Sequence, residues 1–207
     1  MNLNLKDDNL WNEKFISKTQ NKKIKLTVKR KNIVQSQVSL IMSAINSTNK
    51  MWWTQQVLFK YIGGGSYSRL FTRIREELGL CYSVGSRLLT MAYPNCNIAN
   101  MYCSTSSKNV NIFIDECEKE IQKMLKNGLD KKVFDCAKTA LIAQTFRRIE
   151  TSDGMANYLL MPCLFGTNSD LEDIVSKIQK VTIDDCNFVT QKIFQGNWNN
   201  WAVMNPA

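Results

Sequence analysis

The sequence predicts an α+β fold, a single domain in which a largely antiparallel sheet is covered mainly on one face by helices. Two patterns lead to this prediction. Short segments with apolar residues at every second position occur near both ends of the chain and before its middle, as half-buried strands require. Longer segments carry apolar residues three or four positions apart, which is typical of helices that bury one side.

The predicted order begins with two strands and a helix. Residues 22–31 alternate basic and apolar side chains, which favours an edge strand, because outward lysines discourage association with another sheet. Residues 34–44 carry apolar side chains at alternate positions from Val38 to Met42, and therefore predict a strand with one buried face. An Asn-Ser-Thr-Asn turn then leads into a helix over residues 50–62.

After the glycine-rich stretch described below, two strands, a run of helices and a closing strand complete the order. Most of these helices are expected to start at a serine, threonine or aspartate, whose side chain can accept a hydrogen bond from a free backbone N–H. The expected elements are strands 83–90 and 97–104, joined through Tyr93-Pro94-Asn95, helices beginning near residues 107, 130 and 152, helices 169–179 and 182–194, and strand 198–204.

Length and composition fit one domain, because 207 residues of which 44% are hydrophobic can bury a substantial core. We expect residues 1–23 to be a flexible N-terminal segment and residues 24–207 to form the domain. No run of about 18 apolar residues suggests a membrane span, and we read neither a signal peptide nor a presequence. The seven cysteines form no Cys-x-x-Cys pair, which favours a reducing compartment, and we expect a cytoplasmic protein.

The stretch that organises the remaining prediction begins at residue 59 and reads FKYIGGGSYSRLFTRIREELGLCYSVGS. An apolar helix breaks at Gly63, Gly64 and Gly65, which lack a Cβ and can therefore take positive φ and let another backbone come close. Ser66 or Ser68 is then expected to cap a new helix by accepting a hydrogen bond.

That new helix is predicted to bury an apolar face running from Leu70 through Ile74 to Leu78. Arg69, Arg73, Glu76 and Glu77 fall largely on the opposite face. A glycine follows the helix, as is common at helix ends.

From residue 80 the pattern changes to that of a strand. Strict alternation places Tyr82 and Val84 on one side of this strand and Cys81 and Ser83 on the other. The segment is therefore predicted to run from helix through a glycine stop into a strand.

The chain contains no histidine. It can hold neither a His-x-x-Glu-His zinc site nor a serine–histidine pair, and it has no imidazole base. A zinc site of four thiolates has no support from the scattered cysteine spacing. We therefore predict no metal ligands and no cofactor in this chain, and no enzymatic activity of the chain alone.

The same stretch resembles the signature of the insulinase-like (pitrilysin) zinc peptidase family, which includes the mitochondrial processing peptidases. The similarity is to the second domain of that family, which does not bind zinc. More than a dozen positions match in one unbroken run, from the three glycines through Ser-Arg-Leu-Phe and Ile-Arg-Glu to Gly-Leu-x-Tyr-Ser-Val. A weaker similarity extends over residues 34–206. The resemblance implies the half-domain fold of this family.

The resemblance also implies a function and a site. Family members close two homologous halves around a peptide, and one half carries zinc on a His-x-x-Glu-His helix. The other half supplies an arginine and a tyrosine that reach the substrate near the metal, and the matching positions here are Arg75 and Tyr82. A guanidinium and a phenol can both donate hydrogen bonds to a peptide carbonyl or to the oxyanion that develops from it.

The glycine triplet is the second implied contact with substrate. Together with the following serine it offers a backbone surface against which an extended peptide can lie. The four residues are Gly63, Gly64, Gly65 and Ser66.

Each of these residues also has an ordinary structural interpretation. Arg75 can be an exposed helix charge that pairs with Glu76 or Glu77, and Tyr82 can be a half-buried aromatic of a strand. The glycines can simply terminate a helix.

Three functional interpretations remain open. The first is a non-catalytic, substrate-binding half of a two-chain zinc metalloprotease, whose partner is a homologous histidine-bearing chain that holds the zinc. A second is a structural or interaction protein that keeps the fold without proteolysis, by self-association or otherwise. The third, nucleic-acid binding, rests only on charge: residues 14–75 contain thirteen Lys and Arg but no Asp or Glu, and no nucleic-acid motif accompanies them.

Overall fold

The computed structural model describes residues 24–45, 49–89, 97–165, 170–195, 198 and 200–207. It contains a five-stranded sheet in the order β1-β5-β2-β4-β3. The β1–β5 pair is parallel and the other three neighbouring pairs are antiparallel. The strands are β1 (Lys25–Arg30), β2 (Ser36–Ser43), β3 (Cys81–Leu89), β4 (Ile98–Thr105) and β5 (Asn200–Pro206).

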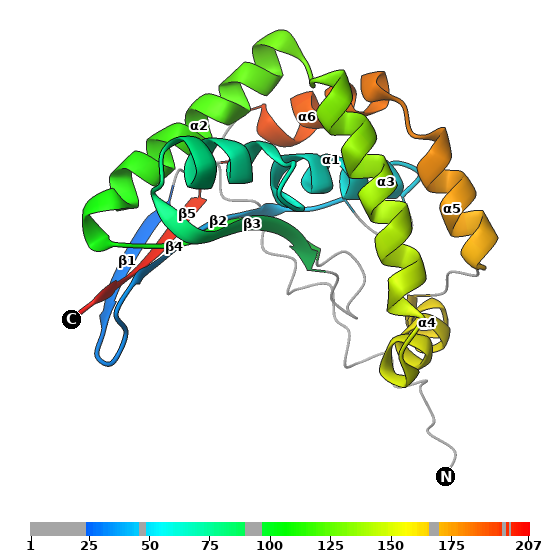
Figure 1. Ribbon diagram of the computed structural model, residues 1–207, viewed down its shortest axis with the longest axis horizontal. Helices are drawn as coiled ribbons and strands as arrows, with labels where there is room; N and C mark the ends of the chain where they lie inside the picture. Colours follow the sequence, from blue (N-terminus) through cyan, green and yellow to red (C-terminus); the bar gives the residue numbers. More distant parts are fainter. Residues whose placement is uncertain (1–23, 46–48, 90–96, 166–169, 196–197, 199) are drawn as a thin grey trace, which may run out of the picture.

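Helices cover one face of this sheet and leave the other face open (Figure 1). The predicted α+β class with a largely antiparallel sheet covered mainly on one face is therefore confirmed. The helices are α1 (Trp52–Gly63), η3 (Phe71–Glu77), η4 (Ser107–Asn109), α2 (Val110–Asn127), α3 (Lys131–Arg148), α4 (Ser152–Phe165), α5 (Leu171–Lys180) and α6 (Ile183–Phe194).

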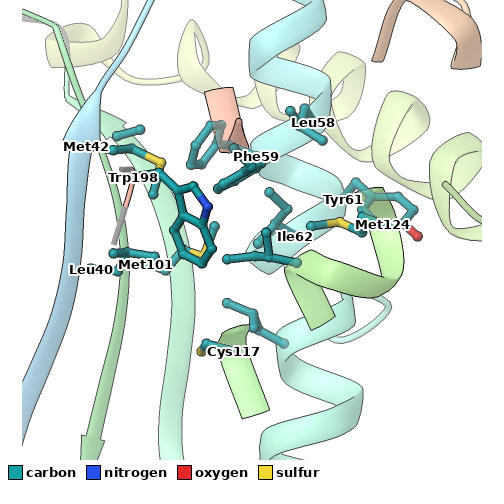
Figure 2. Close-up of a cluster of buried hydrophobic side chains, with 14 of the residues drawn as sticks. Leu40, Met42, Leu58, Phe59, Tyr61, Ile62, Met101, Cys117, Met124 and Trp198 are labelled. Atoms are coloured by element: carbon teal, nitrogen blue, oxygen red, sulfur yellow. The ribbon is translucent and has the colours of Figure 1, made fainter. Parts of the chain in front are cut away.

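The core lies between the sheet and the helices, with α1 at its centre. In β2 every second residue from Val38 to Met42 is buried, as the alternation predicted. Figure 2 shows Leu40 and Met42 of β2 on one side of this core and Phe59 and Ile62 of α1 on the other. Burial of such side chains contributes about 1.5–3 kcal/mol each, so α1 is fixed against the sheet and its C-terminal end has a defined position.

β1 is an edge strand, as predicted, because it pairs with β5 alone. All six of its residues are exposed. Leu26 and Val28 pair with Ala202 and Met204 of β5 and share with them the face that the helices leave open. The lysines thus alternate with apolar side chains that the fold leaves uncovered.

Helix starts follow the predicted chemistry at α3 and α6 but not at α2. The predicted serine cap before α2 was wrong, because neither Ser106 nor Asn109 makes a side-chain cap hydrogen bond. Asp130 accepts a hydrogen bond from the N–H of Val133 at the start of α3, and α6 begins with a capping box between Thr182 and Asp185. α5 departs from the prediction of a hydroxyl cap, because the carboxylate of Asp170 fills that position. A carboxylate is an equally good acceptor and also favours the positive end of the helix dipole.

Three parts of the prediction lie outside the described residues, namely the N-terminal segment 1–23, most of the turn before α1 at residues 46–48, and the loop at residues 93–95. No helix in the described part of the chain is long and apolar enough to cross a membrane.

Candidate functional site

The glycine triplet forms the junction between α1 and the next helix. Gly63 is the last residue of α1 and packs so closely on β3 that a Cβ would collide with the backbone N of Ser86 and would lie 2.6 Å from the backbone carbon of Gly85. Gly64 donates its N–H to the carbonyl of Lys60 at 2.9 Å. The glycines with positive φ in the described residues lie elsewhere in the chain, so the triplet serves close backbone approach rather than left-handed geometry.

The two serines after the triplet behave differently from the prediction. Ser68 is fully buried, and its hydroxyl donates to the carbonyl of Gly65 at 2.6 Å instead of accepting a hydrogen bond as a cap. Ser66 is exposed. No side chain caps the start of η3, because Ser68 has turned its hydroxyl back onto the glycine loop.

The helix itself departs from regular α geometry. Residues 71–77 form a π-helix, a rare form that occurs frequently at functional sites. Leu70 and Ile74 are buried as predicted, but Leu78, at 36% exposure, is not part of the buried face. Leu78 follows the last helical residue and precedes Gly79, whose φ of +60° turns the chain towards β3. The helix therefore ends one residue before the predicted apolar face does.

A β-bulge sits at Tyr82 and changes which side of β3 each residue faces. Cys81 pairs with Thr105 and Ser83 pairs with Ser104, so that Tyr82 is one extra residue on β3. The prediction that Tyr82 and Val84 share one side was wrong, because alternation fails across a bulge. Tyr82 is 78% exposed, whereas Cys81 packs against the core.

π-helix and bulge together bring the predicted arginine and tyrosine side by side. The guanidinium carbon of Arg75 lies 4.7 Å from the ring centroid of Tyr82 and 4.8 Å from that of Phe71. Among the described residues Arg75 has no ion pair or hydrogen bond, and the nearby carboxylate of Glu77 pairs with Arg73 instead. Stacking uses the flat face of a guanidinium, so the N–H groups at its edge stay available.

On its other side the helix is held by two buried carboxylates of α2. Arg69 donates from Nε and from one terminal nitrogen to Oε2 of Glu120, at 3.1 and 2.8 Å. Arg73 makes the same kind of contact with Glu116, at 2.8 Å for both nitrogens. The side chains of Glu120 and Glu116 are only 2% and 9% exposed. Arg69 and Arg73 thus lie opposite the apolar face of their helix, as the sequence predicted, and contact α2 there.

Electrostatic effects in this charged cluster favour the ionised forms. A hydrogen bond from Lys119 lowers the pKa of Glu116, and the bond from Arg73 acts in the same direction, against a smaller effect of burial. Hydrogen bonds to Glu77 and Glu116 raise the pKa of Arg73. Burial lowers the pKa of Arg69, but the hydrogen bond and the charge of Glu120 outweigh it and the net direction is upward. The cluster therefore fixes η3 on α2.

Sequence reasoning missed this cluster, although a signal was present. Arg69 and Arg73 are four residues apart, and so are Glu116 and Glu120. Two matched charged pairs at helical spacing predict two helices that face each other through four charges. The pairing also neutralises two of the thirteen basic side chains of residues 14–75, so that less positive charge is left for an acidic partner.

The described residues contain no group of three or more Cys, Asp or Glu side chains placed to hold a metal ion, and the chain has no histidine. The residues of this chain thus do not fit the zinc site of a peptidase. A shallow groove of about 540 Å³ lies between α3 and α4, beside Ile149, Met155 and Leu159. None of the predicted site residues lines it.

Comparison with known proteins identifies the family of the chain. A family model described as the peptidase M16 inactive domain matches residues 4–141. The chain belongs to the M16 inactive-domain family. An uncharacterized zinc protease from Streptomyces coelicolor is 28% identical over 173 residues, which are 83% of this chain and 37% of that protein. The chain thus spans less than half the length of this M16 relative.

Solved structures of other proteins share the fold. A protease from Helicobacter pylori superimposes with a TM-score of 0.79 at 15% identity, over 90% of this chain and 45% of that chain. A chain of complex III2 from Candida albicans gives a TM-score of 0.75 at 12% identity, over 89% and 46% of the two chains. At these identities the likeness concerns the fold alone.

Proposed function

We propose that this chain is the substrate-binding, non-catalytic half of a two-chain zinc metalloprotease. Its companion is a homologous half that carries the histidines and the zinc. Membership in the M16 inactive-domain family supports the non-catalytic character, and the name of the Streptomyces coelicolor relative, a zinc protease with more than twice the matched length, supports a second half.

One observation carries the proposal for the site. The guanidinium carbon of Arg75 lies 4.7 Å from the ring centroid of Tyr82. Tyr82 is mostly exposed and therefore does not hold the core. The guanidinium edge and the phenol O–H are two donors that a peptide carbonyl oxygen can accept from at once. Donors fixed in advance stabilise negative charge as it develops on that oxygen, because they need no reorganisation.

The glycine loop takes a supporting role in this proposal. Gly64 and Gly65 are half-buried and Ser66 is exposed, so an extended peptide can approach the backbone there. Gly63 has a different duty, since its contact with β3 holds the end of α1 next to the strand that carries Tyr82.

A purely structural role is the second candidate. The likeness to a chain of complex III2, which concerns the fold alone, supports it. Both candidates require association with a partner, but only the protease subunit requires the donors of Arg75 and Tyr82.

The deciding experiment measures assembly and cleavage separately. Arg75→Ala and Tyr82→Phe are each mixed with the histidine-bearing companion, and complex formation and peptide hydrolysis are assayed. Each variant is expected to assemble normally and to lose roughly 10²-fold in turnover, the scale of removing one oxyanion donor.

Arg87→Ala and Tyr102→Phe are the matched controls. Arg87 also stacks on a tyrosine ring, that of Tyr102 at 5.2 Å, on the open face of the same sheet. These controls are expected to cleave at the unmodified rate. Normal cleavage by both Arg75→Ala and Tyr82→Phe would leave the structural role as the better conclusion.

A further inference from the structure

Two cysteines face each other on neighbouring strands beside the candidate site. Cys81 opens β3 opposite Thr105, and Cys103 of β4 lies opposite Val84. The two cysteines are therefore diagonal neighbours on the helix-covered face, with the bulge at Tyr82 between their positions. The register of the two strands therefore brings the two side chains towards each other, and both cysteines are free.

The two thiols have unequal surroundings. Cys81 is partly exposed, whereas Cys103 is 1% exposed. The hydrogen bond from Cys103 lowers the pKa of Cys81 and the charge of Arg75 adds to this effect, against the opposing effect of burial. The same hydrogen bond and burial raise the pKa of Cys103. Cys81 is thus the more acidic and more accessible thiol of the pair and Cys103 the one that keeps its proton more firmly, an arrangement typical of redox-sensitive pairs.

We propose that Cys81 and Cys103 form a redox-active thiol pair, which a hydroperoxide converts into an intramolecular disulfide. The Cys81 thiolate attacks the terminal oxygen of the peroxide, the O–O bond breaks, and an alcohol or water leaves with the second oxygen. Cys81 is then a sulfenic acid. The sulfur of Cys103 attacks it, the S–O bond breaks, and water leaves with the Cys103 proton. The two thiols lose two electrons in total, and the peroxide gains them.

Closing this bridge affects the candidate site directly. Diagonal neighbours lie about 7–8 Å apart, which is beyond the usual Cα–Cα range of about 4.4–6.8 Å for a disulfide, so the backbone must shift where the ladder is already interrupted. That place is the bulge at Tyr82. Oxidation also removes the thiolate whose charge faces Arg75. The disulfide form is therefore expected to displace the arginine and tyrosine from their reduced arrangement.

Other described cysteines do not share these properties. Cys117 is fully buried in the core (Figure 2), and burial raises its pKa well above the ordinary value. Burial raises the pKa of Cys186 to about 12. Cys136 is exposed and serves as the matched control for simple accessibility.

The test treats the reduced full-length chain with a small excess of hydrogen peroxide. The expected product has lost two hydrogens by intact-mass measurement, and fragmentation of its peptides joins Cys81 to Cys103. Before oxidation, alkylation of Cys81 is expected to be at least about tenfold faster than that of Cys103, which corresponds to one pKa unit. No partner is needed, so the result is independent of the proposed function.

Variants make the assignment specific. Cys103→Ala is expected to stop at a sulfenic acid on Cys81 that a cyclic 1,3-diketone traps, and Cys81→Ala is expected to form no bridge. Cys136→Ala is expected to behave like the unmodified chain. A bridge that persists in Cys103→Ala, or an unmodified Cys81 while Cys136 is oxidised, would overturn the proposal. Peptide mapping of the unmodified chain decides the question even if a variant fails to fold.

Discussion

The two sides of one short helix show how the same residue type takes two different roles. On the side of η3 that faces α2, Arg69 and Arg73 are tied to the buried carboxylates of Glu120 and Glu116. On the side that faces β3, Arg75 has ring contacts and no carboxylate. All three arginines lie within a stretch of seven residues, yet only the first two form ion pairs with buried carboxylates.

This difference indicates how the site is held in place. A guanidinium that pairs with a buried carboxylate cannot be released without leaving an uncompensated charge. The charged side of η3 therefore fixes the helix on α2, and the stacked side presents Arg75 to the open surface. If this division is correct, variants on the charged side lower stability and variants on the stacked side leave it almost unchanged.

Removing Glu120 should give the largest effect. Glu120→Ala leaves Arg69 and Lys123 without their partner, and breaking a buried ion pair costs about 3–5 kcal/mol. We expect about 3 kcal/mol, because Arg69 is 32% exposed and water can solvate it in part. Urea unfolding followed by circular dichroism measures the change.

Asp115→Ala is the control for that experiment. Asp115 is on the same helix and is exposed, so its removal should change the free energy of unfolding by less than about 0.5 kcal/mol. Equal losses in the two variants would contradict a fixing role for the charged side.

A smaller effect with a defined pH dependence is expected from Glu116. Its folded pKa is lowered, so the stabilisation is complete above the ordinary value of 4.5 and is lost as the pH falls through the lowered folded value. Glu116→Gln should therefore cost about 1.5 kcal/mol near neutral pH, as for hydrogen bonds to charged groups. The gap in urea midpoint between the variant and the unmodified chain should close in acid. A gap that stays constant at all pH values would show that the carboxylate charge is not involved.

The fold was predictable from the sequence because its strands and helices bury one side each. β2 and α2 show this most clearly, since their buried residues repeat with the periods of two and about 3.6 that the pattern contained. Helix starts were predictable where a single side chain caps them, as at Asp130 and Thr182. These features depend on local chemistry alone.

The site was predictable only in part. The motif located Arg75 and Tyr82 correctly next to each other, but the π-helix and the bulge follow from tertiary packing and broke the regular alternation around Tyr82. The carboxylate partner of Arg69, Glu120, lies 51 residues away in the chain, and ordinary helix patterns assign such arginines to solvent. Short-range rules therefore identified the two candidate residues but not the ion pairs that hold their helix on α2.

The smallest expected effect belongs to Arg75 in the isolated chain. An exposed cation–π contact contributes about 0.5–1 kcal/mol, and Arg75→Ala removes no charge partner. We therefore expect a loss of at most about 1 kcal/mol in the free energy of unfolding, measured in urea. Arg73→Ala is the matched comparison two residues earlier, and it should lose clearly more than Arg75→Ala, because Glu116 then keeps only Lys119. A loss for Arg75→Ala as large as for Arg73→Ala would mean that the stacked side also holds the helix, and Arg75 would then no longer be free to meet a substrate.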